Sequence, residues 1–352
     1  MKPVARALAA AGIVPTLVFT GQHARLKPAD FGLDIFPALL LACPGQADPH
    51  VHVQAVARAL QPLLLRDPPD LFAVQGDTSS ALGGALAALG SAVPLAHVEA
   101  GLRTHDPRLP WPEEEYRIAI DAGADLLFAP TKRAAANLRA EQVHGDIHVT
   151  GNTSIDAVFE AAKQLPSPAP KRGGPPRLLV TCHRRESWDG GLESIAAALG
   201  EIARKSDARI EVVLHPNGFV ARTMRARLAG IGGIALLEPC GHDQLLRRMR
   251  DSALVLSDSG GIQEEAPALG VPLLVLRDKT ERPEGIEAGV SLLVGTDAAR
   301  ITAEVRRLLD DPAALAAMSR PALPFGDGRA GERIAEIAAR WLEQRSLTRR
   351  LA

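Results

Sequence analysis

Few cysteines, few aromatic residues and no surplus of one charge distinguish this chain of 352 residues. Its three cysteines, Cys43, Cys182 and Cys240, lie far apart without metal-type spacing, so neither a metal site nor a disulfide framework is predicted. Lysine and arginine number 40 against 41 aspartates and glutamates, which leaves no basic surface for nucleic acid. A small molecule is therefore the expected partner.

Long apolar runs are also lacking. None approaches the roughly 20 residues that a membrane span requires, and no charged, apolar and small-residue leader precedes the first helix. We therefore expect a cytoplasmic protein with no membrane partner, a compartment that also suits scattered thiols. What the chain does have is 46% hydrophobic residues, and its length suggests about two domains, each with its own core.

Short runs rich in leucine and β-branched residues alternate with longer amphipathic segments rich in alanine and leucine. This alternation is typical of helices packed on a parallel sheet and predicts an α/β fold. In the first half, strands are expected at residues 15–20, 71–75, 94–98, 126–129 and 147–150, with helices near 50–66, 79–90, 113–123 and 132–141.

A segment rich in proline and glycine, residues 166–176, interrupts the alternation. It can sustain neither a helix nor a strand ladder, so we interpret it as a linker or an exposed interdomain loop. Strands are then expected at 178–181, 210–214, 234–237, 254–256, 273–276 and 292–294. The sequence thus predicts two doubly wound domains, residues 1–165 and 166–329. The C-terminal helix, within residues 330–352, is expected to join the first domain.

The stretch Ser257–Glu265 follows an apolar run and has the form of a phosphate-binding turn. Gly260 and Gly261 allow backbone N–H groups to approach an anion, and the helix that follows adds unpaired amides and the positive end of its dipole. The hydroxyl of Ser259 and the carboxylate of Glu265 complete a nucleotide cradle. A tight strand-to-helix connection explains the glycines equally well, so other loops must decide.

Polar residues gather just past the carboxyl ends of several expected strands, where doubly wound sheets bind ligands. Singly, each has a plain structural explanation: Asp77 and Thr78 could cap a helix, and His97 could be a satisfied core histidine. Together, carboxylates and histidines with arginines among them indicate a ligand site in one crevice. The loops are residues 76–78, 97–103, 150–153, 183–186 and 215–217.

Long motifs in these loops and beyond them resemble a known family. They are His97–Thr104, Trp111–Glu114, Val149–Thr153, His183–Ser187, Ser257–Glu265 and Thr280–Glu284. In this order, over nearly the whole chain, they resemble the non-hydrolysing bacterial UDP-N-acetylglucosamine 2-epimerases. The resemblance implies a glycosyltransferase-B-like fold, two Rossmann-like domains with the active site in the cleft between them. It also implies a homodimeric isomerase that makes UDP-N-acetylmannosamine for cell-surface polysaccharides.

The chemistry of carbon 2 (C2) of the sugar limits the routes by which its configuration could be inverted. No neighbouring carbonyl acidifies the C2 proton of an acetamido sugar, so direct deprotonation would need a carbanion that no side chain here could stabilise. If UDP leaves C1 while a carboxylate removes the C2 proton, a neutral glycal forms, and UDP can add back with a proton delivered to the other face. This elimination route is the one attributed to the family. It requires neither NAD nor a metal ion, and the sequence offers a site for neither.

By residue-by-residue resemblance, Asp77, Glu99, Glu113 and His183 fall on the family's catalytic positions. Asp77 and Glu113 are the candidates for moving protons, and Glu99 would influence their protonation through like-charge coupling. His183 would contact the leaving phosphate or the sugar near C1. Without the resemblance, Glu113 would be explained as a first-turn helix carboxylate favoured by the helix dipole.

The resemblance also assigns the contacts with the nucleotide. Ser259, Gly260 and Gly261 would take the diphosphate, Glu265 the ribose hydroxyls, and Arg282 a phosphate or sugar charge. For Arg282, the alternative is a solvated arginine.

Some members of the family are activated by a second substrate molecule. Gln22, Arg184 and Arg185 match residues used for this purpose, so activator binding is a further expectation.

The chain departs from the family at its start and near the uracil. The family begins with a strand and a Gly-Thr-Arg-Pro-Glu loop, whereas Met1 already lies inside the following helix. We expect a misplaced start site rather than a functional deletion, and weak or no turnover if the chain truly begins here. Near the base, Cys240 and Leu245 replace a polar and an aromatic residue, so the resemblance does not extend to those contacts.

Three other activities compete with this interpretation. A hydrolysing relative would release UDP and free N-acetylmannosamine, and an epimerase of a related UDP-diacetamido uronic acid would differ mainly in its sugar pocket. A non-catalytic UDP-sugar-binding protein would bind UDP without exchanging the C2 proton. Product analysis and solvent deuterium exchange separate these alternatives.

Overall fold

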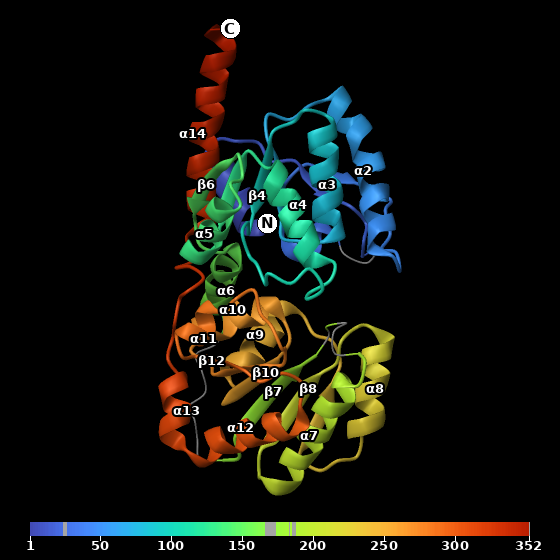
Figure 1. Cartoon of the computed structure of the whole chain (residues 1–352), viewed down its shortest axis with the longest axis vertical. Helices are drawn as coiled ribbons and strands as arrows, with labels where there is room; N and C mark the ends of the chain where they lie inside the picture. The colour runs from blue at the N-terminus through green and yellow to red at the C-terminus, as the bar shows by residue number, and fades with distance from the viewer. Residues whose placement is uncertain (24–26, 166–173, 183, 185–187, 352) are drawn as a thin grey trace. The chain divides into compact units, whose positions relative to one another are not determined.

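The computed structural model describes residues 1–23, 27–165, 174–182, 184 and 188–351. The chain forms two compact units (Figure 1), unit 1 with Met1–Ala157 and Phe325–Ala352, and unit 2 with Val158–Pro324. The boundaries expected from the sequence, residues 165 and 329, lie a few residues beyond these divisions. Most of the linker segment, together with His183 and Arg185, lies outside the described residues.

Unit 1 contains two parallel sheets. The strands are β1 (Leu17–Phe19), β2 (Ala38–Leu40), β3 (Phe72–Gln75), β4 (Leu95–Val98), β5 (Leu126–Ala129) and β6 (Asp146–Val149). β1 pairs only with β2, and the larger sheet has the order β3-β4-β5-β6. Within the described part of the chain, no strand pairing joins the two sheets. The polar ends of β3, β4 and β5 are therefore placed side by side by their parallel pairing.

Helices cover both faces of the larger sheet of unit 1. They are α1 (Lys2–Ala10), α2 (Pro49–Arg66), α3 (Ser79–Gly90), α4 (Glu113–Gly123), α5 (Lys132–Ala140) and α14 (Ala330–Leu351), with a short 3-10 turn at Pro28–Phe31. Helix α6 (Thr153–Gln164) runs from unit 1 into unit 2, which begins at Val158. On one face, Val4 of α1 and Ile334 of α14 pack on β4 and β5; on the other, α2 to α5 supply the core. The N-terminal and C-terminal helices thus share one face of this sheet.

Unit 2 is a single parallel sheet of doubly wound type. Its strands are β7 (Arg177–Thr181), β8 (Arg209–Val213), β9 (Ile234–Leu237), β10 (Leu254–Ser257), β11 (Leu273–Val275) and β12 (Ser291–Leu293). The order in space is β12-β11-β10-β7-β8-β9. The chain winds outward from β7 to β9, then returns to β10 beside β7 and winds the other way. The switch point, where such sheets bind ligands, lies between β7 and β10.

Alternating side chains of the unit 2 strands build its two cores. Leu178 and Val180 face one cluster with helices α7, α8 and α12, whereas Leu179 and Val255 face another with α9 and α10. The helices are α7 (Gly191–Lys205), α8 (Gly218–Leu228), α9 (His242–Arg250), α10 (Gly260–Ala268), α11 (Glu284–Glu287), α12 (Ala298–Asp310) and α13 (Pro312–Met318).

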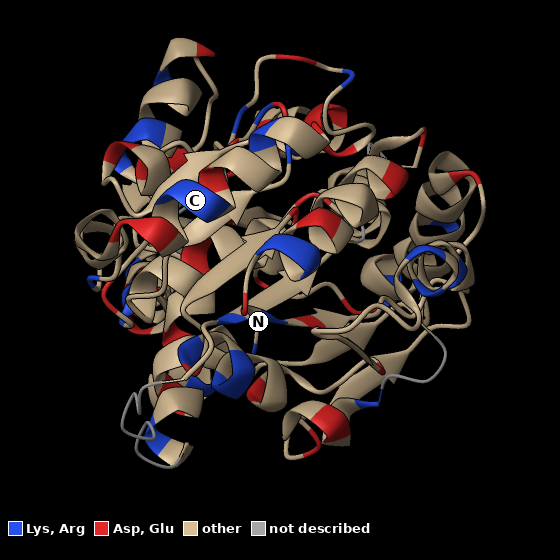
Figure 2. Cartoon of the chain, turned by 90° about the horizontal axis from the view of Figure 1, so that it is seen from below, with Lys and Arg blue, Asp and Glu red and all other residues tan. Residues whose placement is uncertain are grey.

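The α/β class and the expected strands are confirmed, with ends shifted by a few residues. One strand was missed: β2 consists of alanine and leucine, all exposed, and so lacks both the β-branched residues and the burial that mark a strand. Acidic and basic residues are interspersed on the helices (Figure 2), in keeping with the net charge of −1. Among the described residues, no helix combines the length and apolarity needed to cross a membrane.

Candidate active site

Asp77 and Glu99 follow two paired strands of unit 1. Asp77 stands in the turn between β3 and α3, where Gly76 has a φ of 70° and the side chain of Thr78 caps the helix by accepting from the Ala81 N–H. Glu99 directly follows β4. A Cβ atom placed on Gly76 would lie 3.8 Å from Glu99 Oε2, so this carboxylate reaches the backbone next to Asp77. The structure thus brings two of the expected catalytic carboxylates together.

Glu99 has a left-handed backbone, with a φ of 72°. A non-glycine residue in this region costs about 1–3 kcal/mol and persists only where the surroundings fix it. Here the N–H groups of Glu99 and Ala100 both donate to the carbonyl oxygen of Phe128 on the neighbouring strand, at 3.1 Å each. The strained backbone places the Glu99 carboxylate at the end of the sheet. Strained backbone conformations of this kind cluster at functional sites.

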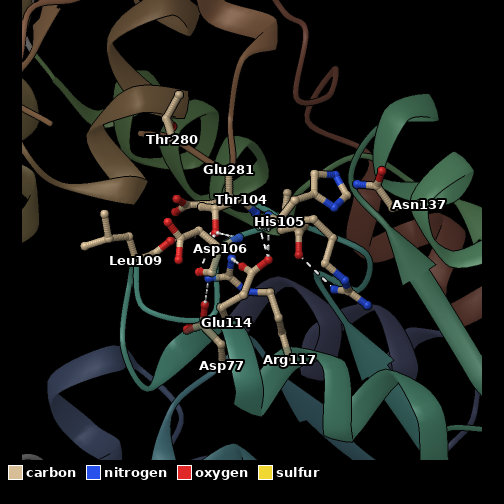
Figure 3. Close-up of polar contacts among 12 residues, drawn as sticks. Asp77, Thr104, His105, Asp106, Leu109, Glu114, Arg117, Asn137, Thr280 and Glu281 are labelled. Carbon is tan, nitrogen blue, oxygen red and sulfur yellow. Dashed lines mark hydrogen bonds and ion pairs between the residues drawn. The ribbon is translucent and has the colours of Figure 1, made fainter. Parts of the chain in front are cut away.

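Asp77 is the half-exposed end of a buried ionic chain (Figure 3). Its carboxylate pairs with Nη2 of Arg117, whose side chain is only 2% exposed. Nη1 of Arg117 donates to Glu114 Oε2 at 2.8 Å. Glu114 Oε1 in turn accepts the backbone N–H groups of Thr104 and His105, at 2.9 Å each. The carboxylate of Asp77 is therefore anchored to the loop that precedes α4.

Glu113 is the first residue of α4 and is partly buried. It follows Pro112, whose peptide bond with Trp111 is cis. Its neighbour Glu114 is 1% exposed and bonded to Arg117, so the two adjacent glutamates have different environments. The sequence identified Glu113 as a candidate but missed Glu114 and Arg117. Their i, i+3 spacing on a helix was a signal that both could share one face.

His97, a residue of β4 in unit 1, is fully buried. Nδ1 lies 2.5 Å from Asp121 Oδ1, and Nε2 lies 2.9 Å from the carbonyl oxygen of Gly76. Asp121 Oδ2 accepts the Gly101 N–H and pairs with Arg103 at 2.8 Å. Although burial alone would raise the pKa of Asp121, the contacts with His97 and Arg103 hold it below its usual value. The core interpretation of His97 is confirmed, and the residue also fixes the turn that carries Asp77.

Gln22, the activator candidate in unit 1, lies near the start of α3. Its Oε1 accepts a hydrogen bond from Ser80 Oγ at 2.7 Å. Ser80 Oγ also lies 2.8 Å from Thr20 Oγ1, so β1 is connected to the helix that follows Asp77.

In unit 2, the expected phosphate turn stands at the topological switch point. Ser257 ends β10 opposite Thr181 of β7, and their hydroxyl oxygens lie 2.7 Å apart. Ser257 Oγ also accepts the N–H of Ser259, which precedes α10. The Ser259 side chain does not cap the helix, so it leaves the first amides of α10 to a ligand.

Two arginines crowd the first residue of α10. A Cβ atom placed on Gly260 would lie 3.0 Å from Arg282 Nη1 and 3.4 Å from Arg184 Nη2. Arg282 is 8% exposed and pairs with the carboxylates of Glu264 and Glu281, so the solvated alternative is wrong. Guanidinium groups beside a helix N-terminus make this turn suited to a diphosphate. The sequence had assigned Arg184 to an activator, not to this turn.

Glu265 lies one turn further along α10 and is 8% exposed. Its Oε1 is 2.9 Å from Nε2 of His242, the first residue of α9.

His183 and Arg185 fall outside the described residues, so their predicted positions are untested. Cys182 is buried, which raises the pKa of its thiol well above the usual value and fits an inert packing residue.

Comparison with known proteins identifies close relatives. A family model described as UDP-N-acetylglucosamine 2-epimerase matches residues 6–339. A UDP-N-acetylglucosamine 2-epimerase of Yersinia pestis is 41% identical over 318 residues, 87% of this chain and 83% of the relative.

Solved structures give the same result. The Staphylococcus aureus MnaA structure with UDP has a TM-score of 0.89 at 34% identity and covers 97% of this chain and 93% of that one. The Methanocaldococcus jannaschii UDP-GlcNAc 2-epimerase with UDP-GlcNAc and UDP has a TM-score of 0.82 at 32% identity, over 96% and 95%. These matches confirm the expected glycosyltransferase-B-like fold built from two Rossmann-like domains.

Proposed function

Because the chain belongs to the UDP-N-acetylglucosamine 2-epimerase family, we propose that it is an isomerase that interconverts UDP-N-acetylglucosamine and UDP-N-acetylmannosamine. The observation that carries the proposal is the match of the family model to residues 6–339. The ligands named for the solved relatives, UDP and UDP-GlcNAc, support a UDP-sugar as the substrate.

The proposed reaction is an elimination followed by an addition. The C1–O bond to UDP breaks as a base takes the C2 proton, which leaves a neutral glycal. UDP then adds back to C1 while an acid delivers a proton to the opposite face of C2. Both bonds are re-formed and nothing is oxidised, so the route needs no redox cofactor. It does need groups that hold the leaving diphosphate.

The carboxylates of unit 1 are the proposed proton-transfer groups. Asp77 and Glu113 are assigned to the two faces of C2, and Glu99 is assigned to influence their protonation. The proximity of Glu99 Oε2 to Gly76 and the anchoring of Asp77 by Arg117 support this set. His183 keeps its assignment to the leaving phosphate or the sugar near C1.

The turn of unit 2 is the proposed site for UDP. The N-terminal amides of α10 at Gly260 and Gly261, with the hydroxyl of Ser259, would bind the diphosphate. Arg282 supports this assignment by its closeness to Gly260. Glu265, buried one turn further along the helix, is assigned to the ribose hydroxyls.

Solvent exchange at C2 tests the proposal. The chain is incubated with UDP-N-acetylglucosamine in D₂O, and proton NMR follows the C2 signal and the products. Deuterium at C2 together with UDP-N-acetylmannosamine is the expected result. Free N-acetylmannosamine with UDP would instead identify a hydrolysing enzyme, and UDP binding without exchange would identify a binding protein.

A homodimer in the cytoplasm that supplies cell-surface polysaccharide synthesis is the proposed setting. The free thiols of Cys43, Cys182 and Cys240 suit a reducing compartment. Light scattering after size exclusion measures the assembly: a mass twice that of the 37.2 kDa chain is expected, and a monomer would contradict it.

Activation by a second substrate molecule is proposed to involve Gln22, Arg184 and Arg185. A sigmoidal dependence of rate on UDP-N-acetylglucosamine is expected. Strictly hyperbolic kinetics, with no effect of added substrate on the reverse reaction, would remove this proposal.

A further inference from the structure

His242 is an exposed residue beside the buried carboxylate of Glu265. The imidazole is 46% exposed, whereas the side chain of Glu265 is 11% exposed. Their atoms Nε2 and Oε1 lie 2.9 Å apart, which is within hydrogen-bonding distance. Because Oε1 can only accept when the carboxylate is ionised, Nε2 is the donor. A half-exposed ring thus supplies a directional contact to a carboxylate enclosed by the fold.

The contact lies at the edge of the proposed diphosphate turn. A Cβ atom placed on Gly261 would be 3.8 Å from Glu265 Oε1 and 4.0 Å from Ser259 Oγ. The oxygen that His242 contacts is therefore also the one that faces the glycine turn. Because His242 begins α9 and Glu265 belongs to α10, the contact also links two helices of unit 2.

The bonding capacity of Glu265 allows this contact and a ligand at once. A carboxylate offers about four acceptor sites on its two oxygens. The imidazole occupies one site on Oε1, which leaves Oε2 and a second site on Oε1 for hydroxyl donors. A vicinal diol, such as the 2′- and 3′-hydroxyls of a ribose, presents two donors at matching separation. Inorganic diphosphate presents no such donors.

Charge reinforces the contact. The hydrogen bond to Glu265 raises the pKa of His242, and Asp243 in the same turn of α9 contributes in the same direction. A hydrogen bond between charged partners is about twice as strong as a neutral one.

We propose that His242 is a positioning and specificity-determining residue for nucleotide binding, which fixes the Glu265 carboxylate to accept the ribose diol of a nucleoside diphosphate. The proposal rests on the proposed function, since it takes the α10 turn to be the UDP site. It goes beyond that function by naming a residue outside the catalytic motifs that selects ribonucleotides over ligands without the diol.

Calorimetric titration of the full chain with UDP, 2′-deoxy-UDP and inorganic pyrophosphate tests the proposal. His242→Leu removes the donor and should weaken UDP binding roughly tenfold, the effect of losing one hydrogen bond to a charged group. The loss for 2′-deoxy-UDP should be smaller, and pyrophosphate binding should change less than twofold. His242→Gln, whose amide N–H can replace Nε2, should recover most of the UDP affinity. Gln244→Ala, in the same exposed turn of α9, is the matched control and should stay near the parent.

Three results would overturn the proposal. UDP affinity in His242→Leu within twofold of the parent would show that the contact does not matter. An equal loss for pyrophosphate would place the effect at the phosphates instead of the ribose. Failure of the parent chain to bind UDP at all would refute the nucleotide-binding function itself, and this proposal with it. Unchanged circular dichroism of the variants excludes unfolding as the cause.

Discussion

Replacement of Arg117 by methionine should destabilise unit 1 strongly. Arg117 is the cation between Glu114 and Asp77, and the Glu114 side chain is 1% exposed. Without Arg117, the Glu114 carboxylate keeps, among the described residues, the backbone N–H groups of Thr104 and His105. Removing one partner of a buried ion pair costs about 3–5 kcal/mol. Asp77, 28% exposed, can be solvated by water and should contribute little to this loss.

Thermal unfolding of the full chain, followed by calorimetry, measures the effect. For a unit of this size, 1 kcal/mol shifts the midpoint by about 2–4 °C, so the expected fall in Tm is roughly 6–20 °C. Two units can give two transitions, and only that of unit 1 should move. The double variant Arg117→Met with Glu114→Gln removes the stranded charge as well and should regain most of the lost stability.

Two outcomes would refute this reasoning. A loss below about 1 kcal/mol in Arg117→Met would mean that Glu114 is not an enclosed charge. A double variant no more stable than the single one would mean that methionine itself, rather than the unpaired carboxylate, causes the damage.

Three further predictions follow from the two units. Asp77→Asn should lower the rate of deuterium incorporation at C2 about 100-fold or more, whereas the affinity for UDP, measured by calorimetry, should change little. Exchange near the parental rate would exclude Asp77 as a proton carrier. Gly260→Ala should weaken UDP binding roughly tenfold, since its Cβ would lie 3.0 Å from Arg282 Nη1; unchanged affinity would refute the diphosphate site. The pKa of His242 is raised by Glu265, so this pair stabilises the fold below the usual histidine pKa and the contribution is lost as pH rises through the raised value. NMR titration of the ring should show a lower pKa in Glu265→Gln.

Local sequence signals were enough for every described strand except β2, and for the turns at their ends. Ser257–Glu265 combines an apolar run, two glycines and a helix start, and each of these is a short-range pattern. The parallel pairing of β3 and β4 then places Asp77 and Glu99 together without further information. The proposal that Glu113 is more than an ordinary first-turn carboxylate rests on the family resemblance, because periodicity alone does not distinguish the two.

The missed residues depend on contacts between distant parts of the chain. Arg117 reaches Asp77 across 40 positions, and its i, i+3 spacing from Glu114 would equally suit a solvated ion pair on an amphipathic helix. From the sequence, His242 is predicted to be an exposed polar residue at the start of a helix. The role proposed for it depends on its contact with Glu265 on the next helix. The motif assigned Arg184 to activator binding. Its closeness to Gly260 could be seen only from the structure, because it depends on how the loops meet at the switch point of the sheet. Side-chain pairing of this kind is set by tertiary packing, which propensity and spacing do not encode.

The buried ions of unit 1 explain how a site can hold a strained carboxylate in place. His97 is fully buried, and its ring bridges Asp121 and the carbonyl oxygen of Gly76, the residue before Asp77. Two residues after His97, the backbone of Glu99 adopts its left-handed conformation. One imidazole therefore connects β4, which ends just before Glu99, to the turn that carries Asp77. Catalytic groups lose rate steeply when displaced by about 1 Å. In the proposed site, the contacts of His97 would therefore serve to fix Asp77 and Glu99 relative to each other.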